Sequence, residues 1–250
     1  MSRPLVSIIT PTYNSSGYIC ETIASVQQQT EADWEHIAVD DCSQDHTRDL
    51  LLEHEQKDSR LKTVFLKSNQ GPAAARNTGI QVASGRYIAF VDSDDLWEPD
   101  KLSLQLACMR RPECSFVFGS YYKMMENGPG RALINVPERI DYHGLLNSTV
   151  IATLTAMYDS LKLGKVFMPD IRKRQDFGLW LRLLKKTPWA YGIQQPLGTL
   201  RKRRGSLSSN KPSAMYYTWR VYRECEKLSL CKSIYCFCNY ALRAFIKARR

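Results

Sequence analysis

Tyr87-Ile-Ala-Phe-Val-Asp-Ser-Asp-Asp95 is an apolar run that reads as a buried strand and stops at three carboxylates. Like charges this close together raise the cost of ionising one another, and a divalent cation removes that cost. An Asp-x-Asp at the end of a strand, in a chain that alternates strands and helices, is a candidate site for a metal that holds phosphate oxygens. We expect the chemistry of the chain to take place here.

Outward from this run, the chain alternates short apolar segments with longer stretches that have helical spacing. We expect strands over residues 5–10, 36–39, 61–66, 86–91 and 114–121, and helices over residues 18–29, 73–83 and 176–186, from Asp45 and from Glu98. Alternation of this kind predicts an α/β fold with a mostly parallel, Rossmann-like sheet that is flanked by helices.

Polar clusters follow four of these strands at the points where the strands end. They are Pro11–Asn14, Asp40–Asp45, Lys67–Gly71 and Asp92–Asp95. The carboxyl ends of parallel strands meet at one edge of a sheet, and ligands bind beyond that edge. We therefore expect the four clusters to line one crevice, which is stronger evidence for a site than any single cluster.

Side chains in and beside these clusters suit a nucleotide. Tyr13 could stack on a base, Asp41 could accept a hydrogen bond from a pyrimidine N–H, and Arg76 could reach a base carbonyl or a phosphate. The alternatives make Tyr13 a packed turn residue and Asp40 or Asp41 a helix cap. The first strand is not followed by Gly-x-Gly-x-x-Gly, and the chain has no Gly-x-x-x-x-Gly-Lys-Ser/Thr. Both absences weaken a dinucleotide-binding or P-loop interpretation.

Charge is divided unevenly along the chain. Residues 1–160 contain 14 Lys and Arg against 21 Asp and Glu, whereas residues 161–250 contain 21 against 4, within a total of +10. The basic second half predicts an anionic partner, and nucleic acid, anionic lipid and a diphosphate-bearing substrate all qualify. The basic segments lack RNP-like and helix-turn-helix signatures, so we expect no nucleic-acid partner.

Three further features favour a cytoplasmic protein. None of the eight cysteines lies in a Cys-x-x-Cys pair, which favours reduced thiols. The first ten residues read as a strand rather than a signal peptide. The chain has no uninterrupted run of about 18 apolar residues, so we expect no membrane-spanning helix.

Four ordered motifs resemble those of the inverting family-2 glycosyltransferases. They are Pro11-Thr-Tyr-Asn14, Val39-Asp-Asp-Cys-Ser-Gln-Asp45, Asn69-Gln-Gly-Pro-Ala-Ala-Ala-Arg-Asn-Thr-Gly79 and Val91-Asp-Ser-Asp-Asp95. Gln175-Asp176, with Trp180 and Leu181-Arg182, resembles the acidic catalytic motif of that family. The resemblance covers roughly residues 4–210. Cys42 replaces a common Gly and Gln175 a common Glu, and neither change removes Asp176.

The resemblance implies a GT-A fold, a nucleotide-diphosphate sugar donor and a divalent metal, Mn²⁺ or Mg²⁺, at the Asp-x-Asp. Asp176 would be the general base, Asp94 would ligate the metal, and Asp92 would contact the ribose or the metal. Asp41 would contact the uracil. The residues expected to bind the nucleotide sugar are Thr12, Tyr13, Asp41, Arg76 and Asp92. For Asp176, a structural role beside the helix macrodipole is an alternative that is compatible with catalysis.

The implied activity is transfer of a hexose, glucose or galactose, from a UDP-sugar to an N-acetylhexosamine on diphospho-undecaprenol. A β linkage, commonly β-1,3, would form during assembly of bacterial O-antigen or another surface polysaccharide. A capsular, teichoic or teichuronic acid glycosyltransferase with another acceptor is the alternative within the class. From other classes, a basic nucleic-acid-binding protein leaves the acidic strand ends unexplained, and Asp94 and Asp176 argue against an inactive nucleotide-sugar-binding module.

Two basic segments follow the catalytic motif. Arg201 and Arg204, in the stretch 201–211, could hold the acceptor diphosphate or the donor phosphates, and a solvated loop is an equal alternative. On a helix from Lys232, one narrow face contains the polar and basic residues Lys232, Asn239, Arg243, Lys247 and Arg250. Apolar residues occupy the rest, including Ile234, Phe237, Cys238, Ala241, Leu242 and Phe245.

A basic amphipathic helix of this kind suits an anionic membrane surface, with Phe237, Leu242 and Phe245 inserted among the headgroups. The alternative is a helix that packs on its own domain. We therefore expect a GT-A domain over 1–210, divided into a nucleotide-sugar half, 1–120, and an acceptor half, 121–210. Residues 211–250 would form a membrane-associating tail, so the protein would lie on the inner face of the bacterial cytoplasmic membrane.

Overall fold

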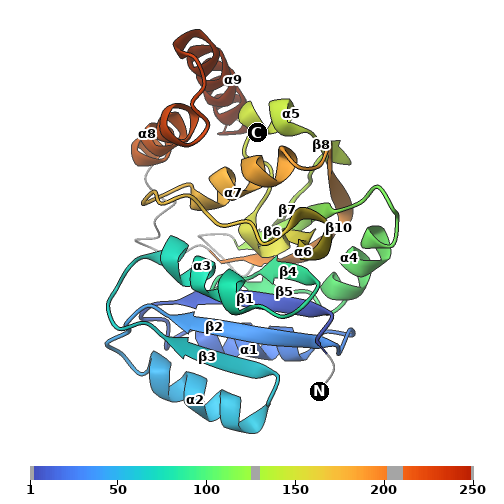
Figure 1. The fold of residues 1–250 in the computed structure, drawn as a ribbon, viewed down its shortest axis with the longest axis vertical. Helices are drawn as coiled ribbons and strands as arrows, with labels where there is room; N and C mark the ends of the chain where they lie inside the picture. The colour runs from blue at the N-terminus through green and yellow to red at the C-terminus, as the bar shows by residue number, and fades with distance from the viewer. Residues whose placement is uncertain (1–2, 125–129, 202–210, 249–250) are drawn as a thin grey trace.

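The computed structural model describes residues 3–124, 130–201 and 211–248, without the side chains of residue 211 and residues 243–248. A single sheet crosses the molecule, and helices pack on both of its faces (Figure 1). Ile9 and Ile37 of the sheet pack with the helix at 72–82, whereas Ala38, on the opposite face, packs with Ile19 and Ile23.

The strands are β1 (Val6–Thr12), β2 (Trp34–Asp40), β3 (Leu61–Phe65), β4 (Tyr87–Phe90), β5 (Leu96–Trp97), β6 (Phe116–Met124), β7 (Arg131–Ile134), β8 (Arg139–Ile140), β9 (Met157–Asp159) and β10 (Ala190–Leu200). The α-helices are α1 (Ile19–Gln27), α2 (Thr47–Lys57), α3 (Pro72–Val82), α4 (Lys101–Met109), α5 (Tyr142–Leu146), α6 (Ser160–Leu163), α7 (Gln175–Leu184), α8 (Lys211–Arg220) and α9 (Leu230–Ala248). A 3₁₀ turn, η1 (Thr153–Thr155), and a π-helical turn, η2 (Val221–Cys225), complete the set.

The sheet has the order β3-β2-β1-β4-β9-β6-β10-β5, with β7 beside β6 and β8 beside β10. The first four strands are parallel, and Ile9 of β1 lies opposite Ile37 of β2 and Phe90 of β4. β9 then runs antiparallel to both β4 and β6, while β6 and β10 are parallel. The predicted α/β fold, with a Rossmann-like sheet flanked by helices, is therefore confirmed. The sheet is mixed: its first four strands are parallel, whereas β9 near its centre and β5, β7 and β8 run antiparallel to their neighbours.

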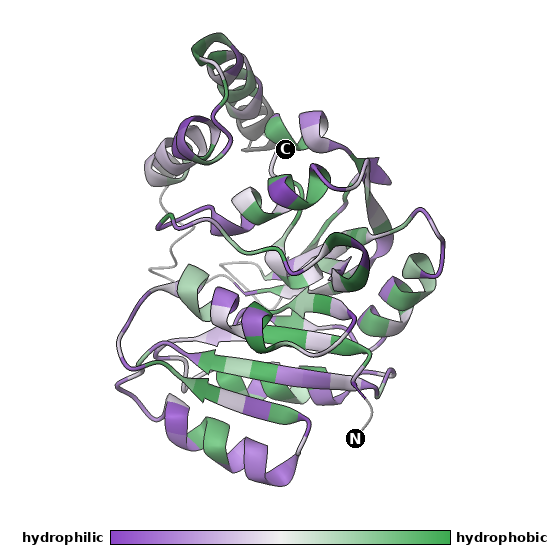
Figure 2. Ribbon diagram, in the orientation of Figure 1, coloured by the Kyte–Doolittle hydropathy of each residue, from purple (hydrophilic) through white to green (hydrophobic). Residues whose placement is uncertain are grey.

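Burial on both faces explains the composition of the central strands. Every residue of β2 and β4 is buried, as parallel strands between two helical layers require. Figure 2 shows hydrophobic residues along β1, β2 and β4. At Gly79 of α3, an added Cβ would lie 2.5 Å from Cγ2 of Ile9. The glycine therefore allows α3 to approach β1 closely, and α3 positions Arg76.

Two buried side chains of the first half, Glu35 and His36, have hydrogen-bond partners within the chain. Glu35 accepts hydrogen bonds from the Ser7 hydroxyl (2.6 Å), the Ser84 amide (2.7 Å) and Lys62 Nζ (2.7 Å). Burial opposes ionisation of Glu35, but these hydrogen bonds outweigh it and lower its pKa to about 2. Burial also lowers the pKa of His36 to about 3, and its Nε2 lies 2.8 Å from the Thr10 hydroxyl.

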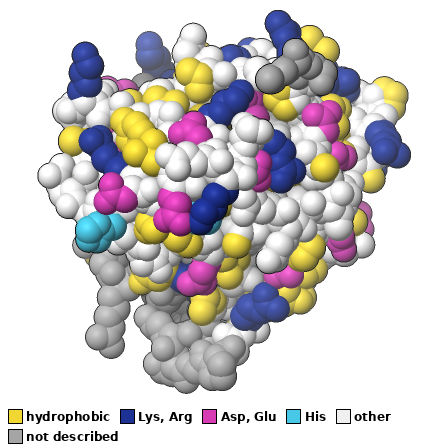
Figure 3. Space-filling model, turned by 90° about the horizontal axis from the view of Figure 1, so that it is seen from below, with side chains coloured by type: hydrophobic (Ala, Val, Ile, Leu, Met, Phe, Trp, Pro, Cys, Tyr) yellow, Lys and Arg dark blue, Asp and Glu magenta, His cyan; other side chains and the backbone are white. Residues whose placement is uncertain are grey.

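On the surface of this half, charges of both signs are mixed. The face seen in Figure 3 carries Lys and Arg side chains interspersed with Asp and Glu. In this half of the chain, ion pairs join such charges, as in Lys57–Glu53 (2.5 Å) and Arg60–Asp58 (2.9 Å). Such exposed pairs contribute little to stability, but they leave little local excess of either charge.

Some sequence expectations need correction. The second helix begins at Thr47 with His46 at its N-cap, and Asp45 caps it from one residue further back, by accepting the Thr47 amide at 3.0 Å. The strands β5, β7, β8, β9 and β10, the short helices α5 and α6 and the turn η1 were not expected. They lie after Asp95, where the alternation of strands and helices weakens.

The carboxyl-terminal segment is helical, as expected, and its inner side joins the main core. Val221 and Tyr222 of η2 are fully buried, and the Tyr222 hydroxyl donates to the Leu146 carbonyl at 2.5 Å. Cys236 and Tyr240 of α9 are also buried. The predicted boundary at residue 210 lies outside the described residues, so the division at that point remains a prediction.

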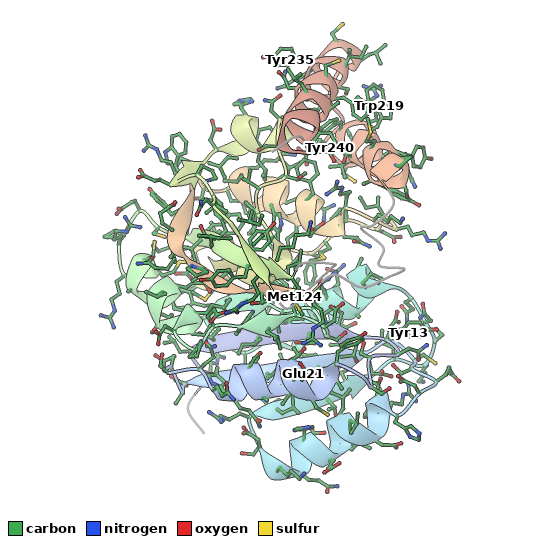
Figure 4. All side chains as sticks on the ribbon, turned by 180° about the vertical axis from the view of Figure 1, so that it is seen from behind. Tyr13, Glu21, Met124, Trp219, Tyr235 and Tyr240 are labelled. Carbon is green, nitrogen blue, oxygen red and sulfur yellow. The ribbon has the colours of Figure 1, made fainter. Side chains whose placement is uncertain are left out.

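The α9 helix uses an unexpected side to pack. Ser233, Cys236 and Tyr240 face the domain, while much of the apolar arc faces outward: Ile234 is 47% exposed and Leu242 59% exposed. Phe237 was predicted to enter a membrane, but it packs against the core and lies 5.7 Å from the Trp219 ring of α8. Figure 4 shows Tyr240 on the part of α9 nearer α7, and Tyr235 further out.

Within the described residues, no helix has both the length and the apolar character to cross a membrane. Phe245, Arg243 and Lys247 have no described side chains, and Arg250 lies outside the described residues.

Candidate active site

The polar clusters at the ends of β1, β2 and β4 come together, as predicted. The amide of Asp41 donates to the Thr12 carbonyl at 2.8 Å, which joins the ends of β1 and β2. The hydroxyls of Ser15 and Ser93 lie 2.7 Å apart, which joins the end of β1 to the Asp-x-Asp turn. Three of the four clusters therefore form one connected edge.

The fourth cluster is attached through Asp41. Its two carboxylate oxygens accept the backbone amides of Gln70 and Gly71, each at 2.7 Å, and Gly71 is the N-cap residue of α3. The buried Asp41 therefore fixes the loop that enters α3. The helix-cap alternative describes part of this arrangement, whereas contact with a base remains a prediction.

Asp40 has a purely internal set of partners. Its Oδ2 accepts the Ser43 amide at 3.0 Å and Arg48 Nε at 2.7 Å, and its side chain is buried. The Thr12 hydroxyl is also buried and points to this group, at 3.4 Å from Asp40 Oδ1 and 3.3 Å from the Val39 carbonyl. Thr12 therefore supports the loop through its side chain.

Tyr13 lies at the open end of the same edge. Its side chain is 47% exposed, and Figure 4 shows it at the margin of the molecule. The next residue, Asn14, has a positive φ of 46°, and its side-chain oxygen accepts the Gln44 amide at 2.8 Å. This turn presents Tyr13 outward, so the alternative of a packed turn residue does not describe it, and its ring face is available for stacking.

Arg76 pairs with the Asp-x-Asp motif. Its guanidinium donates to Asp92 Oδ1, and the arginine is buried while Asp92 is one-third exposed. Burial opposes the charge on Arg76, but Asp92 and, more weakly, Asp176 and Asp95 outweigh it and raise the pKa of Arg76. Arg76 therefore lies among the carboxylates of the site and offsets part of their charge.

The same crowding affects Asp95. Burial and the negative charges of Asp92 and Asp94 raise the pKa of Asp95 well above its usual range. Its Oδ1 accepts the backbone amide of Arg201 at 2.9 Å. The turn therefore concentrates three carboxylates in a small space, and such a cluster suits a bound cation.

The donor set of the turn is compatible with Mn²⁺ or Mg²⁺. Within residues 3–124, 130–201 and 211–248, no three His, Cys, Asp or Glu side chains are grouped to hold a metal ion. A hard cation bound together with substrate phosphates needs only one or two protein carboxylates, and Asp94 and Asp92 could supply them.

Beside this turn lies a cavity of about 240 Å³. It is lined by Asp92, Asp95, Leu145, Thr149, Ile151, Ala152, Thr153, Arg174, Asp176, Phe177, Trp180 and Leu200. Asp92 and Asp176, predicted from separate motifs, therefore meet in one space. Asp176 lies in the first turn of α7, as predicted, and Oδ2 of its carboxylate accepts a hydrogen bond from the Thr153 hydroxyl at 3.2 Å.

The turn η1, which carries Thr153, is held from below by buried hydrogen bonds. Trp97 Nε1 donates to the Leu154 carbonyl at 3.0 Å, and Gln105 Nε2 donates to the Thr155 carbonyl at 2.7 Å. Gln105 Oε1 accepts from Lys101 Nζ at 2.5 Å, and burial lowers the pKa of Lys101 well below its usual range. Sequence patterns do not predict this group, because it is assembled from segments about 50 residues apart.

Arg201 is committed to other partners. Its guanidinium donates to Glu21 Oε2 at 2.6 Å and lies 5.1 Å from the centre of the Tyr18 ring. This places it beside α1, on the nucleotide side of the site. Arg204 lies outside the described residues.

Comparisons with known proteins agree with this geometry. The family described as "Glycosyl transferase family 2" matches residues 7–160. A putative teichuronic acid biosynthesis glycosyltransferase, TuaG of Bacillus subtilis, is 46% identical over 98% of each chain. WfgD of Escherichia coli, a UDP-Glc:alpha-D-GlcNAc-diphosphoundecaprenol beta-1,3-glucosyltransferase, is 37% identical over 96% of this chain and 93% of its own. The crystal structure of S. aureus TarS with UDP-GlcNAc has a TM-score of 0.74 at 22% identity, covering 96% of this chain and 72% of that one, and shows the same fold.

Proposed function

The chain belongs to glycosyl transferase family 2 and is a glycosyltransferase, and from this premise we propose that it transfers glucose or galactose from a UDP-sugar to a lipid-linked N-acetylhexosamine. The acceptor sugar would be carried on diphospho-undecaprenol, and the product would be β-linked, with β-1,3 favoured by the similarity to WfgD. One structural observation carries the proposal: Asp92, of the Asp-x-Asp, and Asp176 line a single cavity.

The nucleotide would bind along the edge formed by β1, β2 and β4. Tyr13 offers an exposed ring for stacking, and Asp41 lies where the loop enters α3. Arg76 neutralises part of the negative charge of Asp92, so that an anionic diphosphate can approach. Asp94 and Asp92 would hold Mn²⁺ or Mg²⁺, which supplies positive charge to the leaving diphosphate.

Asp176 would act as the general base. Thr153 orients one of its carboxylate oxygens, while the other has no hydrogen-bond partner among the described residues. That oxygen can accept the proton of an acceptor hydroxyl, whose oxygen bonds to C1 of the donor sugar as the bond from C1 to the diphosphate oxygen breaks. UDP leaves from the opposite face, and an α-linked donor gives a β-linked product. Such base catalysis contributes roughly 10²–10⁴-fold.

A lipid-linked acceptor would bring the enzyme to the inner face of the cytoplasmic membrane. The outward side of α9 supports peripheral attachment, because Leu230, Ile234 and Leu242 are exposed beside the exposed Lys232. Ile234→Ser with Leu242→Ser should weaken binding to vesicles of anionic lipid by at least about tenfold. Leu161→Ser, at an exposed leucine remote from α9, is the matched control and should bind as the unaltered protein does.

A panel of UDP-sugars tests the activity itself. The enzyme would be incubated with Mn²⁺ and a GlcNAc-diphospho-lipid, and the linkage of the product would be determined by NMR. We expect a β-linked hexose from UDP-glucose or UDP-galactose. No transfer from any UDP-sugar, or an α-linked product, would contradict the proposal.

A second function has specific support. The 46% identity with TuaG supports a role in teichuronic acid assembly, for which we expect an acceptor other than lipid-linked GlcNAc. Including acceptors that lack GlcNAc in the panel distinguishes the two functions, because each predicts product with a different acceptor.

A further inference from the structure

We infer that Arg172-Lys173-Arg174, named here the basic segment, binds the diphosphate of the acceptor; this rests on the proposed function, in which the acceptor sugar is linked to a lipid through a diphosphate. The segment directly precedes α7 and is two to four residues from Asp176. Nothing in the motifs of the family's nucleotide site involves it.

The segment places three cations next to one another in the chain. None of its three cations forms an ion pair within the described part of the chain, whereas Arg76 and Arg201 pair with Asp92 and Glu21. Arg172 is exposed, and its side chain has no hydrogen-bond partner among the described residues. Three neighbouring cations repel one another, and a bound anion lowers that cost.

Arg174 brings this charge into the cavity. It lines the space that contains Asp176, and its Nε is buried with no hydrogen-bond partner. It is held in the left-handed region, with φ 64°, at the N-cap of α7. A buried donor without an acceptor costs free energy, which a phosphate oxygen in the cavity would recover.

The shape of the acceptor matches this placement. In a sugar linked through C1 to a diphosphate, the ring separates the phosphate from the hydroxyl on C3. The general base and the phosphate-binding cations must therefore lie on different sides of one sugar. Asp176 faces Thr153 on η1, whereas Arg174 extends to the other side, where its Nη2 donates to the Tyr240 hydroxyl of α9 at 2.7 Å.

The lipid chain has a path away from the segment. Lys173 Nζ donates to the Ser213 hydroxyl of α8 at 2.8 Å, so the segment contacts both α8 and α9. These helices expose Met215 and Tyr216 on one and Ile234 and Leu242 on the other. A polyprenyl chain that leaves the diphosphate here would meet an apolar surface rather than the charged face of the nucleotide half.

Two water-soluble acceptors test the inference without a membrane. Both carry the same GlcNAc, one on a short-chain alkyl diphosphate and one on an uncharged alkyl group. For Arg174→Gln, and separately for Arg172→Gln with Lys173→Gln, kcat/KM for the diphosphate acceptor should fall at least about tenfold more than for the uncharged one, as expected for a lost charge-assisted hydrogen bond. Arg223→Gln removes an exposed cation near α8 and α9 and should leave the ratio unchanged.

The outcomes separate the possible sources of the diphosphate. An equal fall for both acceptors overturns the inference, because the segment would then have only a structural role. A rise in KM for the UDP-sugar that matches the loss also overturns it, because the cations would then bind the donor. The unaltered enzyme could use neither GlcNAc acceptor and yet hydrolyse UDP-sugars or transfer sugar to a different acceptor. That result would contradict the proposed function itself, and not only the inference about the basic segment. Circular dichroism and thermal unfolding confirm that each variant is folded.

Discussion

The nucleotide edge of the sheet and the start of α7 use their charged groups in different ways. At the nucleotide edge, Asp40 and Asp41 already accept hydrogen bonds from this chain's own backbone, and Asp92 is paired with Arg76. At the start of α7, Arg172 and Nε of Arg174 lack partners among the described residues. Nε of Arg76 in the first region also lacks a partner, but the carboxylates named there are already hydrogen-bonded within the chain. In the second region no cation of the basic segment has an ion pair among the described residues, so its charges are left for a ligand to satisfy.

This contrast has an energetic meaning. A preformed network costs no ordering when the donor binds, so binding free energy can go into affinity and orientation. Unpaired cations beside a cavity favour whichever anion fits between them. We therefore expect changes in the first region to affect donor binding or folding, and changes in the second to discriminate among acceptors.

The largest effect should come from Asp94. If the Asp-x-Asp turn needed no cation, the proposed division between a donor region that binds a metal and an acceptor region that binds an anion would be wrong. Asp94→Asn should lower turnover by about a thousandfold, since the positive charge that a metal supplies to the leaving diphosphate is worth several kcal/mol. Calorimetry should also show the loss of Mn²⁺-dependent UDP binding. Full activity of the unaltered enzyme in excess EDTA would refute the expectation.

Asp176 lies where the two regions meet, and it tests whether they can be separated. Asp176→Asn keeps the shape of the side chain but removes the proton acceptor, so turnover should fall at least about a hundredfold. UDP binding should be unchanged, because the residue belongs to the acceptor side of the cavity. Asp49→Asn, at an exposed carboxylate of α2, is the control. Activity within a few-fold of the unaltered enzyme would reassign Asp176 to a structural role in α7.

Glu35 tests the rigidity of the nucleotide half far from the chemistry. Its folded-state pKa of about 2 lies below the usual value of 4.5, so its ionised form stabilises the fold. This stabilisation is complete above pH 4.5 and is lost as the pH falls toward 2. Glu35→Gln should lower the free energy of unfolding at pH 7 by about 2 kcal/mol, with a smaller difference near pH 3. Urea unfolding at both values measures it, and a difference independent of pH would show that the charge is unimportant.

Substitution of Gln105 should have the smallest effect, and it tests whether η1 belongs to the acceptor side of the cavity. Gln105→Met leaves the Thr155 carbonyl and Lys101 without their partner, which should cost about 1–2 kcal/mol of stability. Because η1 carries Thr153, kcat should fall a few-fold while KM for UDP-sugar stays constant. A change in KM alone would show that η1 serves the donor instead.

The sequence predicted the nucleotide edge better than the acceptor side, for a physical reason. Asp41 and Asp92 each follow an apolar strand directly, so local pattern and parallel topology place them together. Thr153 meets Asp176 only through a 3₁₀ turn that rests on Trp97 and Gln105. No periodicity marks such contacts between distant segments, so the supporting residues could not be predicted.

The carboxyl-terminal helix illustrates a second limit. Its periodicity correctly predicted an amphipathic helix, but not which side would pack. The domain contacts Ser233, Cys236 and Tyr240, whereas the more apolar arc with Ile234 stays outward. Packing there is decided by the shape of the surface that η2 and α7 present, and a single helical sequence contains no record of that surface. The basic segment before α7 was visible in the sequence, but only its position at the cavity gives it significance.

The hydrogen bond between Arg174 and Tyr240 has a consequence for selectivity. It joins α9 to the start of α7, and so fixes the distance between the outward face of α9 and the carboxylate of Asp176. If α9 rests on the lipid surface, the carboxylate of Asp176 lies at a set distance from the membrane. A hydroxyl on the first sugar of the carrier would lie at the reach of Asp176, and the same hydroxyl one sugar further out would lie beyond it. The enzyme would then select acceptors by the number of sugars already attached to the lipid carrier, because that number sets the distance of the hydroxyl from the membrane.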